Sequence, residues 1–373
     1  MSFIKNNYQN KFSLFYRLIG LWLGLFMLII RFITPPQYIE AFYSRFVFQG
    51  IRKLFDYTLA LLPIPLLLIF YGIMVYFVVK TLVFLLSKKR PLPRRFTEGG
   101  LKMLNFLGFM LFGFFLLWGF NYGRPSFAKQ IGMTVQKLDT TAIRQELLIS
   151  AQEAIAARDT LIKQMLLENA TTNDTNTIFS ISLDFETKIR QNVSILLEKY
   201  QFPARGNLRG RQIKPDGLLF RFGIAGIYMP YIGESSIDNA LYPLEKPFSM
   251  AHEMAHGYGW TEEATANFVA YLSCIQSNDL LTRYSGYLSY YRYVASNFKR
   301  QFPKEYTIFR KSLPKGIQND LTAINNRINQ YPDWFDTSSI NDVYLKSQGV
   351  TEGVGSYSRM VVLVYSWRNS KIR

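Results

Sequence analysis

Three long apolar runs fall within the first 120 residues, and each is about the length of a membrane-crossing helix. They cover residues 14–33, 65–86 and 101–120. About 20 apolar residues in helical conformation span the hydrocarbon core of a bilayer, so the pattern predicts three transmembrane helices. Between the first two runs, residues 38–58 have apolar side chains at helical spacing and basic ones elsewhere on the helical wheel. We expect an amphipathic helix there, lying either on the membrane surface or against the other spans.

From Asn121 onward the pattern is that of a soluble domain. Residues 140–168 place apolar side chains along one helical stripe, and residues 182–200 also favour a helix. Residues 204–217 are basic and rich in glycine, which favours exposure to solvent. Residues 218–228 are rich in Leu, Phe and Ile, which favours one or two short strands. The fold class is therefore expected to be mainly α, with a small β-sheet in the soluble part.

The charge distribution predicts the membrane topology. The chain carries a net charge of +17, and residues 1–120 hold 14 basic and three acidic side chains, or +11 of that total. A basic cluster, Lys88–Arg95, lies between the second and third apolar runs, and such loops are usually cytoplasmic. The N-terminus is then cytoplasmic, and residues 121–373 form an extracytoplasmic domain after a membrane domain at residues 1–120. Because the basic excess lies among the apolar runs, membrane lipid is an expected partner and nucleic acid is not.

One motif of the soluble part has a direct chemical interpretation. His252-Glu253-Met254-Ala255-His256 contains the only two histidines of the chain, spaced four residues apart. On a helix both imidazoles project from one face and can bind the same metal ion. Glu253 then lies beside the open side of the metal, where a carboxylate serves as general base. The motif therefore predicts a hydrolytic zinc site.

A second helix is expected to supply the third metal ligand. Thr261 is a plausible N-cap, and Glu263 and Asn267 lie four residues apart on the helix that would follow. Two histidines and a carboxylate leave the fourth position of a tetrahedral zinc ion open, as catalysis requires. We favour Glu263 over Glu262, because Glu262 in the first helical turn is already explained by the exposed amides there. Asn267 is expected to orient a ligand histidine through its second ring nitrogen.

Three acids precede the motif, at Glu234, Asp238 and Glu245. They are possible additional ligands. Acidic side chains in loops are usually solvated, however, and the sequence favours that interpretation.

Several short motifs accompany the histidine pair. They are Gly226-Ile227-Tyr228-Met229-Pro230, Glu263-Ala264-Thr265-Ala266-Asn267-Phe268, Tyr284-Ser285-Gly286-Tyr287-Leu288, Tyr344-Leu345-Lys346, Gly349-Val350 and the stretch from Gly353 to Tyr357. Together they resemble a bacterial family of uncharacterised polytopic membrane proteins regarded as zinc metallopeptidases with a gluzincin-like site. The resemblance extends from the first apolar run to about Ser366. One departure is Gly257, where members often have Gln.

The resemblance implies a zincin-like fold for residues 121–373. It also implies one zinc ion per chain, a peptide or protein substrate, and a location in a bacterial cytoplasmic membrane. In zincins an edge strand near the motif helix pairs with an extended substrate, and residues 218–228 resemble that strand. The family-like motifs downstream offer Tyr284, Tyr357 and Arg359 as candidates for stabilising the oxyanion.

The predicted function is zinc-dependent hydrolysis of peptide bonds, with Glu253 moving the proton. The alternative is a membrane-anchored structural or sensing protein with a non-catalytic metal site. The presence of Glu253 favours the enzyme, because a purely structural site needs no base.

Overall fold

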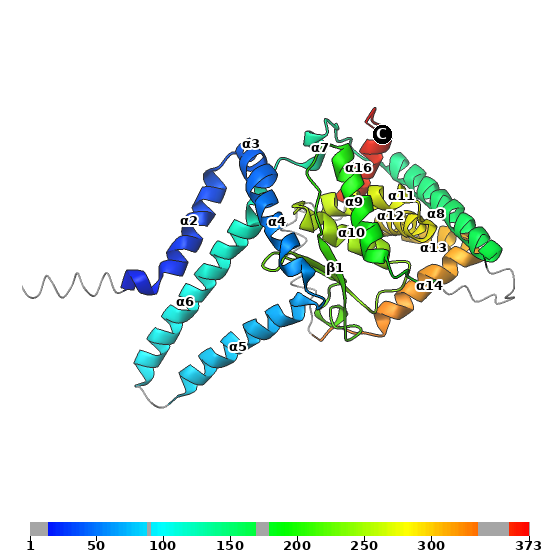
Figure 1. The fold of residues 1–373 in the computed structure, drawn as a ribbon. Helices are drawn as coiled ribbons and strands as arrows, with labels where there is room; N and C mark the ends of the chain where they lie inside the picture. The colour runs from blue at the N-terminus through cyan, green and yellow to red at the C-terminus, as the bar shows by residue number, and fades with distance from the viewer. Residues whose placement is uncertain (1–13, 88–90, 169–178, 335–357, 373) are drawn as a thin grey trace, which may run out of the picture. The chain divides into compact units, whose positions relative to one another are not determined.

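The chain divides into two compact units, and both are mainly helical (Figure 1). The computed structural model describes residues 14–87, 91–168, 179–334 and 358–372. Unit 1 comprises Met1–Arg124 and Met229–Gly233, and unit 2 comprises Pro125–Tyr228 and Glu234–Arg373. The sequence predicted a boundary after residue 120. It did not predict that the short turn Met229–Gly233 belongs with the N-terminal unit.

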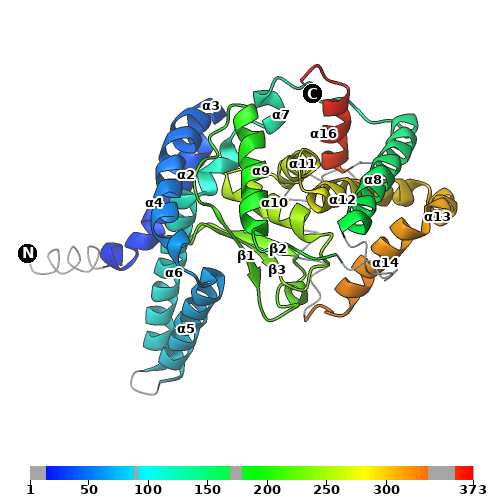
Figure 2. The ribbon, with the colours of Figure 1, turned by 45° about the vertical axis from the view of Figure 1, so that its right-hand side comes forward.

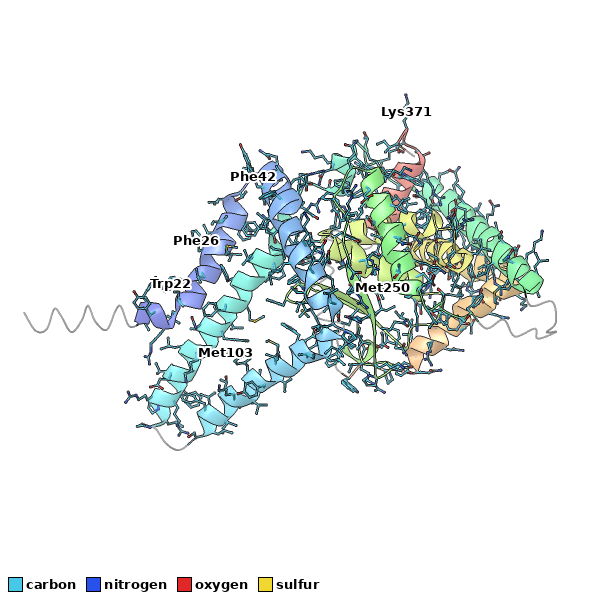
Figure 3. All side chains as sticks on the ribbon, in the orientation of Figure 1. Trp22, Phe26, Phe42, Met103, Met250 and Lys371 are labelled. Carbon is cyan, nitrogen blue, oxygen red and sulfur yellow. The ribbon has the colours of Figure 1, made fainter. Side chains whose placement is uncertain are left out.

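Unit 1 contains two helices that are long and apolar enough to cross a membrane, α5 (Leu66–Leu86) and α6 (Leu92–Leu117). A third crossing is possible if α2 (Ile19–Ile33) and the helical stretch Pro36–Leu61, which meet at 112°, form one broken span. The described residues thus offer two to three candidate spans, where the sequence predicted three. Large apolar side chains are exposed on these helices, including Trp22 and Phe26 on α2 and Met103 on α6 (Figure 3).

Helices α2 and α6 pack closely through glycines. A Cβ atom added at Gly20 would lie 2.4 Å from the carbonyl oxygen of Asn105, and one at Gly24 would lie 2.6 Å from that of Gly108. The backbone N–H of Gly20 also donates to Asn105 Oδ1 at 2.7 Å. Small residues permit this approach. Because the contacts advance along both helices in the same direction, α2 and α6 run parallel.

Helix α5 runs antiparallel to α6. The Phe77 ring lies 5.3 Å from the Phe106 ring, and Arg95 near the start of α6 donates to the carbonyl oxygen of Leu85 near the end of α5. The chain direction therefore alternates from α2 to α5 to α6.

The predicted start of the third span, residue 101, was wrong. Helix α6 begins at Leu92 rather than at residue 101, and it ends at Leu117 before the 3-10 turn η3 (Gly119–Gly123). The additional turns are polar and include an ion pair between Arg94 and Glu98 at 3.2 Å. Hydropathy marks only the apolar part of a helix, whereas helical hydrogen bonding continues through a polar end.

The predicted amphipathic stretch is helical. It consists of α3 (Pro36–Tyr38), the π-helix η1 (Ile39–Val47), α4 (Phe48–Tyr57) and the 3-10 turn η2 (Leu59–Leu61). Its polar inner face holds the turn Met229–Gly233. Buried Arg52 pairs with Asp56 at 2.5 Å and donates to the carbonyl oxygen of Gly233 at 3.0 Å. The helix therefore packs on protein along this face.

Unit 2 is built around α10 (Lys246–Gly257), the helix that carries the histidine motif. The other helices of its described residues are α7 (Phe127–Gln130), α8 (Thr140–Glu168), α9 (Phe185–Lys199), α11 (Glu263–Ile275), α12 (Leu280–Gln301), α13 (Pro303–Ser312), α14 (Lys315–Asn329) and α16 (Arg359–Arg368). The helices predicted at residues 140–168 and 182–200 are confirmed as α8 and α9.

A three-stranded sheet packs against α10 and α9 (Figure 2). Its strands are β1 (Arg209–Ile213), β2 (Gly226–Met229) and β3 (Glu234–Asp238), in the order β1-β3-β2. Strands β1 and β3 are parallel, with Arg209 opposite Glu234. Only four residues join β2 to β3, too few for a parallel crossover, so these two strands form a hairpin.

The prediction that residues 204–217 are exposed was wrong for the middle of this stretch, which forms β1. Gly210 and Ile213 are buried, and a Cβ atom added at Gly210 would lie 2.4 Å from the sulfur of Met250 on α10. The glycine thus serves close strand–helix packing. Of the stretch predicted as strands, only its end forms β2, whereas Phe220–Phe222 is the 3-10 turn η4.

An aromatic core joins the elements that carry the motif. The ring of Phe127 lies 4.8 Å from Trp260, 5.2 Å from Phe202 and 5.8 Å from Phe268, all of them buried. Trp260 follows α10 and Phe268 belongs to α11, so this cluster fixes how one helix leads into the next.

Candidate metal centre

Helix α10 brings the two histidines onto one face. Pro247 lies in its first turn, where its missing N–H costs nothing, and Met250, Ala251 and Met254 are buried in the core. His252 and His256 are one turn apart, and their Nε2 atoms are 3.1 Å apart. The motif thus forms the paired imidazoles expected from its spacing.

Helix α11 presents Glu263 to both imidazoles. Its Oε2 atom is 3.1 Å from His252 Nε2, and its Oε1 atom is 3.3 Å from His256 Nε2. A turn with Gly259 at φ +87° reverses the chain between the helices, a conformation that favours glycine. Helix α11 begins at Glu263, with Glu262 at the N-cap position, so the predicted N-cap at Thr261 was wrong by one residue.

The cluster has the dimensions of a tetrahedral metal site. Ligand atoms about 2.0–2.1 Å from zinc in tetrahedral geometry are about 3.3 Å from one another. The closest separations among His252, His256 and Glu263 are 3.1, 3.1 and 3.3 Å. These three residues are also the only group of three or more His, Cys, Asp and Glu side chains found, within the described residues, that could hold a metal ion. The donor set and spacing fit zinc.

The outer nitrogens of both histidines face hydrogen-bond acceptors. His252 Nδ1 is 2.9 Å from Asn267 Oδ1, and His256 Nδ1 is 2.6 Å from the carbonyl oxygen of Trp260. In the neutral imidazole each Nδ1 therefore carries the proton, and each Nε2 then has a lone pair. Two lone pairs 3.1 Å apart repel each other unless a proton or a cation lies between them. The predicted contact of Asn267 with the second ring nitrogen of His252 is present.

Tyr293 on α12 extends this network and was not singled out from the sequence. Its hydroxyl donates to Asn267 Oδ1 at 3.1 Å. The amide oxygen thus receives two donors, which fixes the amide orientation and with it the tautomer of His252. The only sequence signal was the high density of tyrosines from Tyr284 to Tyr293, which does not distinguish one ring from another.

Glu253 is buried against strand β2. The backbone N–H of Tyr228 hydrogen-bonds its carboxylate, and the hydroxyl of Ser235 donates to its backbone carbonyl oxygen at 2.9 Å. A Cβ atom at Gly226 would lie 2.7 Å from Glu253 Oε1, so only glycine leaves room for the carboxylate. Strand β2 therefore determines where this side chain lies.

The electrostatics of the cluster follow from burial and from the short separations. Burial lowers the pKa of His252, but the Glu263 carboxylate raises it by more, to about 9. Burial raises the pKa of Glu263, but the two imidazoles outweigh that effect and lower it far below its usual range. Burial raises the pKa of Glu253, which makes its carboxylate a stronger base. A proton shared by His252 and Glu263 is what a metal ion would replace.

The three candidates for oxyanion stabilisation have different positions. Tyr284 is fully buried, and its hydroxyl donates to Asp320 at 2.6 Å. It lies nine residues before Tyr293 on α12, which is about 13 Å along the helix axis at a rise of about 1.5 Å per residue. The structure therefore does not bring it to the cluster. Arg359 pairs with Glu262 at 2.8 Å, adjacent in sequence to Glu263, and its side chain is 55% exposed. Tyr357 lies outside the described residues.

The acids before the motif are buried, so their predicted solvation was wrong. Glu234 pairs with Arg211 at 3.2 Å, and Glu245 pairs with Arg292 at 2.7 Å. Asp238 accepts backbone N–H bonds from four residues: Gly217, Leu219, Phe220 and Ala240. All three acids hold the fold around the sheet, and none belongs to the metal-ligand cluster.

The chain belongs to the family described as Protein of unknown function (DUF3810), whose model matches residues 43–365. The match covers parts of both units and all of the cluster, and it confirms the resemblance to an uncharacterised family. A comparison with curated proteins found no match, and neither did one with solved structures. Family membership implies no activity, so only the geometry of the site indicates its chemistry.

Proposed function

We propose that this member of the DUF3810 family is a membrane-anchored, zinc-dependent metallopeptidase. The observation that supports the proposal is the arrangement of His252, His256 and Glu263, in which the histidine Nε2 atoms and the Glu263 carboxylate oxygens are 3.1–3.3 Å apart. The Nδ1 atoms of both histidines point away from this cluster, toward hydrogen-bond acceptors. A zinc ion bound there would polarise a substrate carbonyl and make water nucleophilic near neutral pH.

The residues of the chain have separate tasks in this reaction. Glu253 takes a proton from the attacking water and delivers it to the leaving amine. The N–H of Tyr228 keeps its carboxylate in place, and burial keeps it basic. Asn267 and the Trp260 carbonyl hold the two imidazoles in their ligand orientation. Arg359 remains our candidate for stabilising the oxyanion, because it is exposed and pairs with the neighbour of Glu263.

The substrate is proposed to be an extended peptide. Strand β2 lies at one edge of the described sheet, and its Gly226 and Tyr228 both contact Glu253. A peptide that adds to this edge through backbone hydrogen bonds would pass beside the base. Such recognition depends mainly on the backbone and accepts varied side chains.

A non-catalytic, structural metal site would have a different set of protein ligands. A structural site is closed by four protein ligands, whereas this cluster supplies three and has a buried carboxylate, Glu253, at its side. This difference supports the enzymatic function.

We further propose that the N-terminus is cytoplasmic and that unit 2 is extracytoplasmic, in a bacterial cytoplasmic membrane. The support is the basic connection between α5 and α6, of which Arg94 and Arg95 are described and Lys88, Lys89 and Arg90 lie outside the described residues. A membrane-impermeant thiol reagent should label Lys304→Cys from outside and miss Leu92→Cys. The opposite pattern would place unit 2 in the cytoplasm.

The experiment that tests the peptidase function is a comparison of protein termini in cells carrying wild-type or Glu253→Gln chain. New termini should appear in extracytoplasmic proteins only with the wild type. Identical sets of termini at equal expression would contradict the proposal.

A further inference from the structure

At one end of unit 1, a buried glutamate is surrounded by arginines. Glu40 on η1 accepts hydrogen bonds from Arg124, at 2.7 and 3.1 Å, and from Arg45 at 2.9 Å. The Glu40 side chain is 11% exposed and that of Arg124 only 5%. The Arg45 side chain is 40% exposed, so two guanidinium groups, one buried and one exposed, share this carboxylate and leave an excess positive charge.

Arg31, in the last turn of α2, adds a third cation. Its guanidinium lies against Gly123, the residue before Arg124, where an added Cβ atom would be 2.7 Å from Arg31 Cζ. Its Nε atom is buried without a hydrogen-bond partner, and no carboxylate of the described chain forms an ion pair with it. At this end of unit 1, three arginines accompany the single carboxylate of Glu40: Arg124 is buried, Arg31 is half-buried, and Arg45 is 40% exposed. A bound anion would offset their net charge of +2 and satisfy the buried Nε atom of Arg31.

The aromatic residues around this cluster place it at the level of lipid headgroups. Tyr122 follows α6 and Tyr38 follows α2, and their side chains are 48% and 53% exposed. Trp and Tyr concentrate where a membrane helix meets the headgroup layer. Beside Arg31, Phe32 and Ile33 are 77% and 71% exposed, which offers an apolar surface to acyl chains.

We propose that Arg31, Arg45 and Arg124 form a binding site for the phosphate of an anionic phospholipid headgroup. A guanidinium binds phosphate oxygens through two parallel charge-assisted hydrogen bonds. The close fit of Arg31 against Gly123 distinguishes this site from an arginine that merely extends toward the headgroups. The proposal rests on the membrane insertion of α2 and α6 and not on peptidase activity.

The test is native mass spectrometry of the delipidated full-length chain in detergent, with phosphatidylglycerol, phosphatidylcholine or inorganic phosphate added. Phosphatidylglycerol should bind most tightly, and Arg31→Gln should weaken it by about tenfold or more, as expected for the loss of a bidentate charged contact. Lys53→Gln is the matched control, because it removes the same charge from an exposed position on α4. It should leave the affinity unchanged.

Three results would overturn the site. Equal losses in Arg31→Gln and Lys53→Gln would mean that only net charge matters. Equal affinity for both lipids would remove the preference for an anion, and displacement by inorganic phosphate at the same concentration as lipid would identify a free-anion site. If Arg31→Gln does not fold, Arg31→Lys replaces it: this variant keeps the charge but not the two-pronged contact, so unchanged lipid affinity would overturn the proposal.

Discussion

The hydrogen-bonded chain from Tyr293 through Asn267 to His252 permits a quantitative prediction that needs no substrate. Asn267→Ala removes the acceptor 2.9 Å from His252 Nδ1 and frees the imidazole to rotate and change tautomer. Loss of such a partner typically weakens metal binding by about 10–100-fold. Zinc affinity should fall by that factor in this variant.

Tyr293→Phe removes only the hydroxyl, which lies 3.1 Å from Asn267 Oδ1. Asn267 keeps its contact with His252 and loses only what fixes its orientation. A net hydrogen-bond contribution of about 0.5–1.5 kcal/mol corresponds to roughly a 2- to 12-fold loss of zinc affinity. The two variants are therefore expected in a fixed order, with Asn267→Ala the weaker binder.

The assay is competition for zinc with a chromogenic chelator of known affinity, on full-length purified protein. Tyr287→Phe serves as the control, because it removes a hydroxyl from the same helix at a ring that contacts Tyr271 rather than Asn267. Wild-type affinity in the control and graded losses in the other two variants support the network. If folded Tyr293→Phe loses as much zinc affinity as Asn267→Ala, or more, Tyr293 does not act on the metal site through Asn267.

Three further predictions concern the cluster and its base. Glu263→Ala should weaken zinc binding far more than Glu262→Ala, because only Glu263 approaches both imidazoles, and the reverse order in the chelator assay would move the ligand to Glu262. Gly226→Ala should keep zinc but lower turnover per bound zinc by roughly 10²-fold, because the added Cβ displaces the Glu253 carboxylate by on the order of 1 Å. Unchanged turnover would contradict the inference that strand β2 positions Glu253. Apparent zinc affinity should rise about tenfold per pH unit up to about pH 9, since zinc displaces the proton that His252 retains below its raised pKa. A flat affinity profile between pH 6 and pH 9 would disprove that proton's presence.

Local patterns in the sequence identified helices well and sheet topology poorly. The apolar stripe of α8 and the apolar run of α5 predicted their bounds almost to the residue. Strand β1 was missed because its glycine and arginines resemble an exposed loop, and only α10 packed on Gly210 explains them. The burial of Asp238 was missed for a related reason: four backbone N–H groups satisfy it, and they come from chain folded around it.

The site shows the same division between local and long-range information. The spacing of His252 and His256, and of Glu263 and Asn267, is set by helix geometry, so the sequence predicted these residues together. The contacts of Tyr293 and Gly226 depend on how α12 and β2 pack, which spacing along the chain does not encode. Tyr284 was predicted as an oxyanion stabiliser from its motif alone, but its hydroxyl donates to Asp320 in the folded chain.

Hydrolysis of peptide bonds by a zinc ion held in the cluster, with Glu253 as the base, makes two separable predictions, one on metal content and one on turnover. The most direct measurement combines zinc content by elemental analysis with hydrolysis of a fluorogenic peptide library, for wild type, Glu253→Gln and His256→Ala. Wild type should contain about one zinc per chain and cleave peptides. Glu253→Gln should keep the zinc and lose turnover by about 10²-fold or more, and His256→Ala should lose both. Full zinc in His256→Ala, or wild-type cleavage by Glu253→Gln, would contradict the account.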